Sequence, residues 1–205
     1  GVEIPRFAAL VHPQVINFLK SEAPPKLELK IVRAFDTDKL QTLMALIGKI
    51  GNETTLVFCN HRDAVDRISA LLHQGGVIHD VYHGKLEQDE RQLALLKFRN
   101  GSNQILITTD LASRGLDIPA IKHVVHYQLP QTIEAYTHRN GRTARMHAEG
   151  TAYLILSSEE TVPPFIKDNI AEMELPDKYT LPGPGEWATI YISAGKKDKV
   201  NKVDI

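Results

Sequence analysis

The stretch "NQILITTDLASRGLDIP", residues 103–119, joins a strand pattern to a loop that carries charge. Its first half is a short run of apolar, mostly β-branched residues, which is typical of a strand covered on both faces. The loop then contains Arg114, Gly115 and Asp117. One interpretation is a plain strand-to-helix turn, with Gly115 at a positive φ and Asp117 as the helix cap. The other is a binding loop, because Arg114 places a charged guanidinium group in the loop that follows a buried strand.

Strand and helix patterns alternate on both sides of this stretch. Strands are predicted over 27–35, 54–60, 77–84, 103–110, 121–127 and 150–157, and helices over 37–50, 61–76, 87–101 and 131–142. We expect the first of these helices to be capped by Thr37 or Asp38. Apolar strands between amphipathic helices predict an α/β fold with a five- or six-stranded, mostly parallel sheet between helices. Ligands of such sheets bind at the carboxyl ends of the strands.

Composition limits the class of protein. The chain has 205 residues, a formal net charge of −1 and a single cysteine, Cys59, so it cannot form an internal disulfide. One cysteine fits a reducing compartment, and we expect a cytoplasmic protein. Cys59 lies within an apolar run and is expected to be a small buried thiol. His79 and His83 lie four residues apart on one predicted strand, and that spacing does not bring their side chains together as metal ligands. The sequence contains no run of about eighteen apolar residues, the length that a membrane-spanning helix needs.

Proline and glycine divide the chain into four parts. Residues 1–26 are interrupted by prolines and are expected to be a lead-in from a preceding domain. Residues 27–174 hold the alternating patterns and form the α/β domain. Residues 175–186 have the composition of a linker. Residues 187–205 begin with a strand pattern and are expected to be the truncated start of a further domain.

A second motif places cations close together. The segment "HRNGRTAR", residues 138–145, holds three arginines at a spacing of three, with Gly141 and Ala144 beside them. Such a cluster is either a solvated helix face or a site for an anion. The chain has no GxxxxGK[ST] loop, so it lacks a phosphate cradle of its own.

These motifs together resemble those of the DEAD-box RNA helicases. "LVFCN" is similar to motif IV, "QDER" at Gln88–Arg91 to the QxxR motif, "TTDLASRGLD" to motif V and "HRNGRTAR" to motif VI, in the order and separation of the family. The resemblance covers about residues 30–157 and implies a RecA-like three-layer sandwich, the C-terminal of two such domains. "EIPRFA" resembles the tail of the first domain. The chain departs from the family pattern at His61, Asn140 and Ala144, where threonine, an aliphatic residue and glycine are usual.

The resemblance implies a role in ATP hydrolysis. ATP and Mg²⁺ would be held mainly by the missing N-terminal RecA-like domain, and Arg142 and Arg145 would reach the phosphates across the cleft. Arginines supplied in this way raise phosphoryl-transfer rates by ~10³–10⁵. Asp117 would accept hydrogen bonds from the ribose hydroxyls, and Gly115 would let the backbone approach the nucleotide. For Arg139, a structural ion pair on the helix is the stronger interpretation.

The resemblance also implies RNA binding through the backbone, without sequence readout. Five residues are assigned to RNA: Arg62, Gly84, Arg91, Thr109 and Arg114. They lie at strand ends or helix starts, where guanidinium groups, hydroxyls and backbone N–H groups can bind phosphates. For Arg62 an ordinary exposed helix arginine is an equal alternative. Gln88 is expected to orient Arg91 or to cap its helix.

The predicted function is therefore the C-terminal half of an ATP-dependent RNA helicase, inactive as an isolated domain. The tail "YISAGKKDKVNKVDI", residues 191–205, resembles the opening of the RNA-binding domain of some ribosome-assembly DEAD-box proteins, which would make ribosomal RNA a target. The alternative for the tail is a solvated basic linker. Two alternatives remain for the chain itself: a DNA-directed relative, and a scaffold that binds a protein partner. A scaffold would have no use for Arg142 and Arg145.

Overall fold

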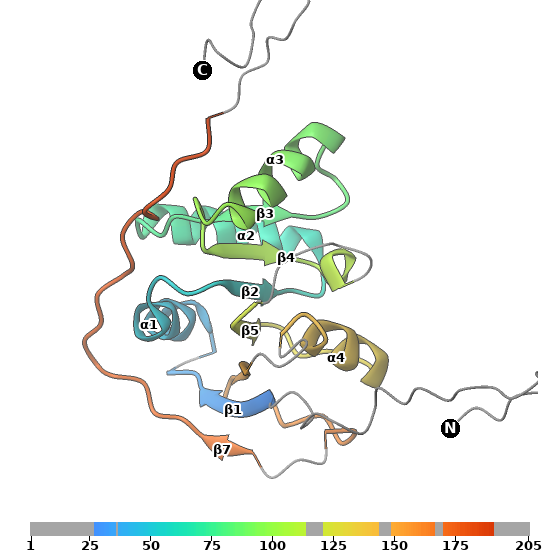
Figure 1. Ribbon diagram of the computed structural model, residues 1–205. Coiled ribbons are helices and arrows are strands. Elements are labelled where there is room, and N and C mark those ends of the chain that lie inside the picture. Colours follow the sequence, from blue (N-terminus) through green and yellow to red (C-terminus); the bar gives the residue numbers. More distant parts are fainter. Residues whose placement is uncertain (1–26, 36, 114–120, 144–148, 167–169, 191–205) are drawn as a thin grey trace, which may run out of the picture.

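The computed structural model describes residues 27–35, 37–113, 121–143, 149–166 and 170–190. Within these ranges the chain forms one seven-stranded sheet in the order β3-β4-β2-β5-β6-β1-β7, with all of its strand pairs parallel (Figure 1). The strands are β1 (Leu27–Arg33), β2 (Thr55–Phe58), β3 (Asp80–Tyr82), β4 (Ile105–Thr108), β5 (His123–His126), β6 (Gly150–Leu156) and β7 (Ala171–Glu172). The helices are α1 (Leu40–Ile50), α2 (Arg62–Gln74), α3 (Gln88–Arg99) and α4 (Ile133–Asn140), with a short 3₁₀ helix, η3 (Asp110–Ser113).

The predicted order of strands and helices is confirmed, and four details of the prediction are wrong. The sheet has seven strands rather than five or six, because the two-residue β7 pairs with β1. The N-cap of α1 is Lys39, although Asp38 Oδ1 accepts the Leu40 N–H at 3.3 Å. The N-cap of α3 is Glu87, in a capping box with Glu90, so of the two alternatives for Gln88 the one in which it caps the helix is wrong. Helix α4 ends at Asn140 and so does not include Arg142.

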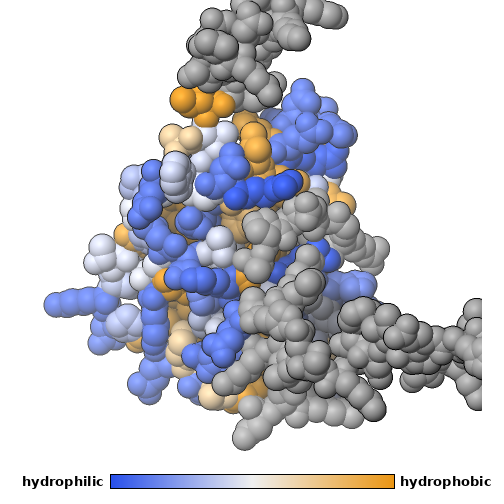
Figure 2. All heavy atoms as spheres, in the orientation of Figure 1, coloured by the Kyte–Doolittle hydropathy of each residue, from blue (hydrophilic) through white to orange (hydrophobic). Residues whose placement is uncertain are grey.

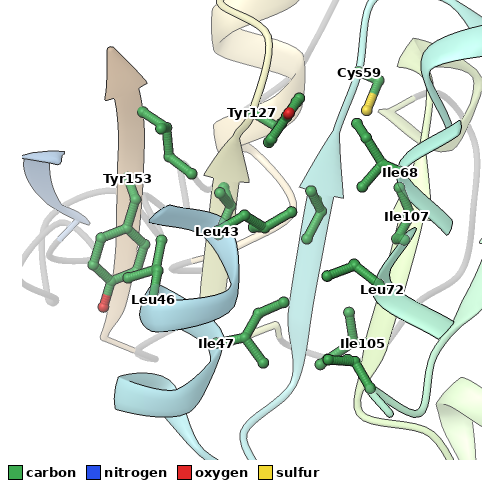
Figure 3. Close-up of a cluster of buried hydrophobic side chains, with 14 of the residues drawn as sticks. Leu43, Leu46, Ile47, Cys59, Ile68, Leu72, Ile105, Ile107, Tyr127 and Tyr153 are labelled. Carbon is green, nitrogen blue, oxygen red and sulfur yellow. The ribbon is translucent and has the colours of Figure 1, made fainter. Parts of the chain in front are cut away.

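Side chains of the strands alternate between two buried faces, as a sheet covered on both sides requires. One face packs against α1 and α2 (Figure 3). Its cluster consists of Val32, Leu43, Leu46, Ile47, Val57, Cys59, Val65, Ile68, Leu72, Val77, Ile105, Ile107, Val125, Tyr127, Tyr153 and Ile155. Neighbouring strand residues point the other way: Leu56 and Phe58 pack with Ala94 and Phe98 of α3. Leu154 packs on that face beside Tyr136 of α4.

The chain after β7 lies along the domain. We call residues 173–190 the strap; in Figure 1 it runs in orange and red from β7 past α1 towards the α3 side. Met173, Leu175 and Leu181 pack against the α1–α2 core. The predicted linker, 175–186, is part of the strap.

Two polar contacts and two close approaches hold the strap against the domain along its length. The Lys49 ammonium donates to the Glu174 carbonyl at 2.9 Å. Tyr179 lies so close to Gly48 that a Cβ there would come within 2.9 Å of it. Further along, a Cβ on Gly185 would lie 2.6 Å from the Gly101 carbonyl oxygen. The hydroxyls of Ser102 and Thr189 are 2.6 Å apart, which ties the last part of the strap to the turn before β4.

The surface is mixed in character. The face shown in Figure 2 is mostly hydrophilic, with scattered apolar side chains. Among the described residues, no helix is both long and apolar enough to cross a membrane.

Candidate functional site

The carboxyl ends of β2, β3 and β4 meet at one edge of the sheet, because these strands are parallel neighbours. A groove of about 530 Å³ opens there. Its lining consists of Asn60, His61, Arg62, Asp63, Gly84, Lys85, Thr109 and Leu111. One wall is the start of α2, the other is the turn between β3 and α3, and the residues that follow β4 complete the lining.

The groove gathers three of the five residues predicted to bind RNA. Arg62, Gly84 and Thr109 all line it. Arg91 is half-buried on α3 and is not part of the lining. Arg114 lies outside the described residues.

Five lining residues were not predicted as site residues: Asn60, His61, Asp63, Lys85 and Leu111. Each lies within two residues in sequence of Arg62, Gly84 or Thr109, which were predicted. A place in the segment that follows a strand is therefore the sequence signal that could have identified them. In the sequence, His61 stands out only as a departure from the family motif.

The side chains that line the groove suit a polyanion whose charged backbone is exposed. Arg62 and Lys85 are exposed cations, one on each wall, and Asp63 lies 3.5 Å from the Arg62 guanidinium. Gly84 leaves its wall open, since a Cβ there would meet only Leu111, at 3.9 Å. None of the described lining residues is Phe, Tyr or Trp, so base stacking is not built into the groove. Cations on two walls favour phosphate contacts over base readout.

Arg139, on α4, joins three strand ends from a fully buried position. Its Nε and Nη2 donate to the two carboxylate oxygens of Asp110 at 2.6 and 3.0 Å. Nη1 donates to the Gln128 carbonyl at 2.8 Å, and Nη2 also donates to Asn60 Oδ1 at 2.8 Å. The guanidinium carbon lies 5.2 Å from the centre of the Phe58 ring. The structural ion pair that was preferred for Arg139 is therefore present.

The end of α4 is tied to β5 by a buried pair. His126 Nε2 donates to Asn140 Oδ1 at 2.9 Å, a bond that the departure at Asn140 makes possible. Burial, and after it the nearby charge of Arg139, lowers the pKa of His126 to about 3, so the ring is neutral. It lies between the Phe58 and Tyr136 rings, with centroids 6.4 and 5.8 Å away.

Arg142 follows this anchored end. Its N–H donates to the Arg139 carbonyl at 3.1 Å, and Thr143 N–H donates to the Asn140 carbonyl at 3.0 Å. The Thr143 hydroxyl donates to the Ile121 carbonyl, which holds the chain against the start of β5. Arg142 is half-buried. The other predicted nucleotide residues, Gly115, Asp117 and Arg145, lie outside the described residues, as does Ala144.

The remaining candidates for chemistry have structural roles. Burial raises the pKa of the Cys59 thiol to about 12, so it is not a nucleophile. His79 Nε2 is 2.8 Å from the Ser69 hydroxyl, whereas His83 Nε2 is 2.9 Å from Asp66, so the two histidines have different partners. In the part of the chain that the structure describes, no three His, Cys, Asp or Glu side chains are grouped as metal ligands.

Residues 38–147 match the family model of the helicase conserved C-terminal domain. The chain is 42% identical over 125 residues to "Probable ATP-dependent RNA helicase ddx17" of Dictyostelium discoideum, covering 60% of this chain and 16% of that protein. It is 31% identical over 200 residues to "ATP-dependent RNA helicase DbpA" of Escherichia coli K12, covering 94% of this chain and 44% of the relative. The chain thus spans less than half the length of either protein.

A solved structure agrees with these sequence matches. The structure of Saccharomyces cerevisiae Dbp5 "bound to RNA and ADP BeF3" superposes with a TM-score of 0.61 at 28% sequence identity. The match covers 67% of this chain and 37% of that one. At this sequence identity the match supports membership of the same family as well as a shared fold.

Proposed function

Since the chain belongs to the helicase conserved C-terminal domain family, as the C-terminal RecA-like domain of a DEAD-box RNA helicase, we propose that the whole protein uses ATP to unwind or remodel RNA. The groove at the carboxyl ends of β2, β3 and β4 is the observation that carries this proposal. This chain supplies one half of the machinery. A separate N-terminal RecA-like domain supplies the other, and ATP draws the two together.

RNA lies in the groove with its phosphates facing the two walls. Arg62 and Lys85 contact phosphates, Gly84 lets the backbone approach closely, and Thr109 offers a hydroxyl. These contacts do not distinguish bases, so binding is independent of sequence. Arg91, which does not line the groove, extends the contact along α3, and Arg114 is a further residue proposed to bind RNA. The solved Dbp5 complex with RNA supports this assignment at the level of the family.

ATP binds between the two RecA-like domains. Arg142 and Arg145 stabilise the charge that develops on the γ-phosphate. Asp117 accepts hydrogen bonds from the ribose hydroxyls, and Gly115 lets the protein backbone approach the nucleotide. Mg²⁺ neutralises phosphate charge and is held, with ATP, mainly by the N-terminal domain. The backbone of Arg142 is held by the anchored end of α4, which fixes the point from which its side chain extends.

The target and location of the protein complete the proposal. Structured RNA such as ribosomal RNA is the proposed substrate, because the tail at 191–205 resembles the opening of the RNA-binding domain of some ribosome-assembly DEAD-box proteins. The protein acts in the cytoplasm. The isolated chain is inactive, because it has no phosphate loop of its own.

Steady-state ATP hydrolysis tests this proposal. The full-length protein should hydrolyse ATP faster when single-stranded RNA is added, and the isolated 205-residue chain should show no hydrolysis with or without RNA. Hydrolysis by the pure chain that survives replacement of Arg142 and Arg145 would contradict the division into two halves. A full-length protein that responds to DNA and not to RNA would support the DNA-directed alternative. One that binds neither nucleic acid would support the scaffold.

A further inference from the structure

A buried histidine stands between the two walls of the groove. His83 directly follows β3, and its side chain is 3% exposed. Its Nε2 lies 2.9 Å from Oδ1 of Asp66, on α2, and its Nδ1 lies 3.3 Å from the backbone nitrogen of Lys85. The ring therefore contacts both walls, although it does not line the groove itself.

The hydrogen bonds fix the tautomer and the orientation of the ring. The Lys85 N–H can only donate, so His83 Nδ1 is the acceptor and carries no proton. The ring proton is then on Nε2, where it donates to the Asp66 carboxylate. Both nitrogens of the ring are in use, and burial holds it in place.

The same turn is held from its other side. Leu86 N–H donates to the His83 carbonyl at 3.3 Å, which closes the turn that presents Gly84 and Lys85. The buried Thr108 hydroxyl donates to the Tyr82 carbonyl at 2.7 Å, one residue before His83. The position of the Gly84–Lys85 turn thus depends on His83 and, through it, on Asp66.

Asp66 connects this turn to the opposite wall. It lies four residues after Arg62 on α2, so the two side chains share one face of the helix. Asp66 is half-exposed, at 48%, and is not part of the groove lining. A bond from Asp66 to His83 therefore sets the separation between the wall with Arg62 and the wall with Lys85.

We infer that His83 is a positioning residue for RNA binding, anchored by Asp66, which holds the two cationic walls of the groove at the separation that the phosphate backbone needs. This inference rests on the proposed function and adds to it a residue pair that touches no RNA. Its effect is on the affinity for RNA, through Arg62 and Lys85, and not on the step at which ATP is cleaved.

Asp66 is the position at which to test this, because a half-exposed helix residue can be replaced without disturbing the core. Asp66→Ala removes the anchor. Asp66→Asn keeps an oxygen that accepts from His83 Nε2 and removes only the charge. Glu172→Ala is the matched control, since it also removes an exposed, ion-paired carboxylate, 2.8 Å from Arg33 at the other edge of the sheet.

Electrostatics and positioning predict opposite signs for Asp66→Ala. Loss of a carboxylate beside an anion-binding groove should strengthen RNA binding if charge alone matters. Loss of the anchor should instead raise the RNA concentration that half-saturates ATP hydrolysis by the full-length protein, by about 3- to 10-fold, the cost of one or two misplaced hydrogen bonds. The kcat at saturating RNA and the basal rate should not change. Asp66→Asn and Glu172→Ala should stay within about twofold of wild type.

Hydrogen exchange in the 205-residue chain supplies a readout that does not depend on RNA. The Lys85 amide should exchange faster in Asp66→Ala than in wild type, and Asp66→Asn should restore its protection. RNA affinity that is unchanged or tighter in Asp66→Ala would overturn the inference, as would a fall in kcat alone or an Asp66→Asn protein as impaired as Asp66→Ala. A wild-type protein whose ATP hydrolysis ignores RNA would instead refute the proposed function, even if the Lys85 amide behaves as expected.

Discussion

Arg139 and Asp110 form a two-pronged ion pair in which only one partner reaches solvent. The guanidinium side chain is 1% exposed and the carboxylate 41%. The pair joins α4, which leads to Arg142, with η3, which follows the groove residue Thr109. Arg139 also donates to Asn60, another groove residue. The segment proposed to bind nucleotide and the segments that line the groove are therefore both held by the buried Arg139 guanidinium.

Asp110→Asn should destabilise the domain by about 2–3 kcal/mol. A buried charge left without its counter-charge costs ~3–5 kcal/mol, and the partial exposure of Asp110 reduces that figure. Urea unfolding of the chain gives the free energy directly. Glu172→Gln breaks an ion pair whose two side chains are both exposed, and it should cost at most about 1 kcal/mol. Equal effects of the two substitutions would show that the Arg139 pair is no more than a surface contact.

The buried, neutral His126 should make the domain less stable in acid. Its pKa is lowered from 6.5 to about 3 in the folded state, so below pH 6.5 only the unfolded chain takes up this proton. Stability is complete above pH 6.5 and falls by up to about 1.4 kcal/mol per pH unit down to about pH 3. His126→Asn should unfold with a correspondingly shallower pH dependence between pH 6.5 and 4. Parallel curves for the two proteins would mean that His126 is protonated without cost.

Arg62 and Arg67 lie on the same helix and allow a matched test of the groove. Arg62 lines it, whereas Arg67 pairs with Asp38 at 2.9 Å, outside the groove. Arg62→Ala should weaken binding of all single-stranded RNAs by the full-length protein and flatten the salt dependence by about one contact. Arg67→Ala should leave both unchanged. Arg91→Ala should weaken binding if RNA extends past the groove to α3. A sequence-selective loss in any of these variants would indicate base readout.

Arg142 and Arg145 should act on turnover rather than on RNA binding. Their proposed partner is charge on the γ-phosphate, so Arg142→Lys and Arg145→Lys should each lower the RNA-stimulated kcat of the full-length protein by ~10²-fold. Lysine keeps the charge but lacks the planar guanidinium group, whose paired N–H donors bind two phosphate oxygens at once. RNA binding without nucleotide should be unaffected. Asp117→Ala should instead raise the KM for ATP. Near-normal kcat in a folded Arg145→Ala protein would reduce Arg145 to a surface residue.

Two glycines give a paired test of the strap. Gly48→Ala places a Cβ 2.9 Å from Tyr179, whereas a Cβ on Gly183 meets nothing within 4 Å. Gly48→Ala should therefore displace the strap and expose the bonds around Tyr179 to limited proteolysis. Gly183→Ala should be cut as slowly as wild type. Equal cleavage of the two variants would show that the strap does not depend on its contact with α1.

The architecture could be predicted because its determinants are local. The apolar runs of β2 and β4, and the helical spacing from Leu40 to Ile47, are visible in any short window. The missed strand has no such pattern: Ala171 and Glu172 are exposed, and only pairing with β1 makes them a strand. The end of α4 at Asn140 was missed because Gly141 continues the turn without continuing the helix.

Motif and strand end coincide at Arg62, Gly84 and Thr109, and this is why the sequence could group three residues that line one groove. For Arg139 the sequence predicts an ion pair but not its partner, because the contacts that support the groove join residues far apart in sequence. Arg139 meets Asp110 across 29 positions and His83 meets Asp66 across 17. The side-chain geometry that brings them together depends on how α2 and α4 pack on the sheet, which no local pattern specifies.

The strap determines where anything beyond Ile190 starts. Its last anchored residue, Thr189, is bonded beside the amino end of β4, and the groove opens at the carboxyl end of the same strand. A module carried after the strap therefore starts at the edge of the sheet opposite to the one proposed to bind RNA. Its local concentration at the groove is set by how far the chain after Ile190 can reach around the sheet. If the groove binds RNA as proposed, lengthening or shortening that chain would change which part of a long RNA reaches the groove, without altering a contact within it.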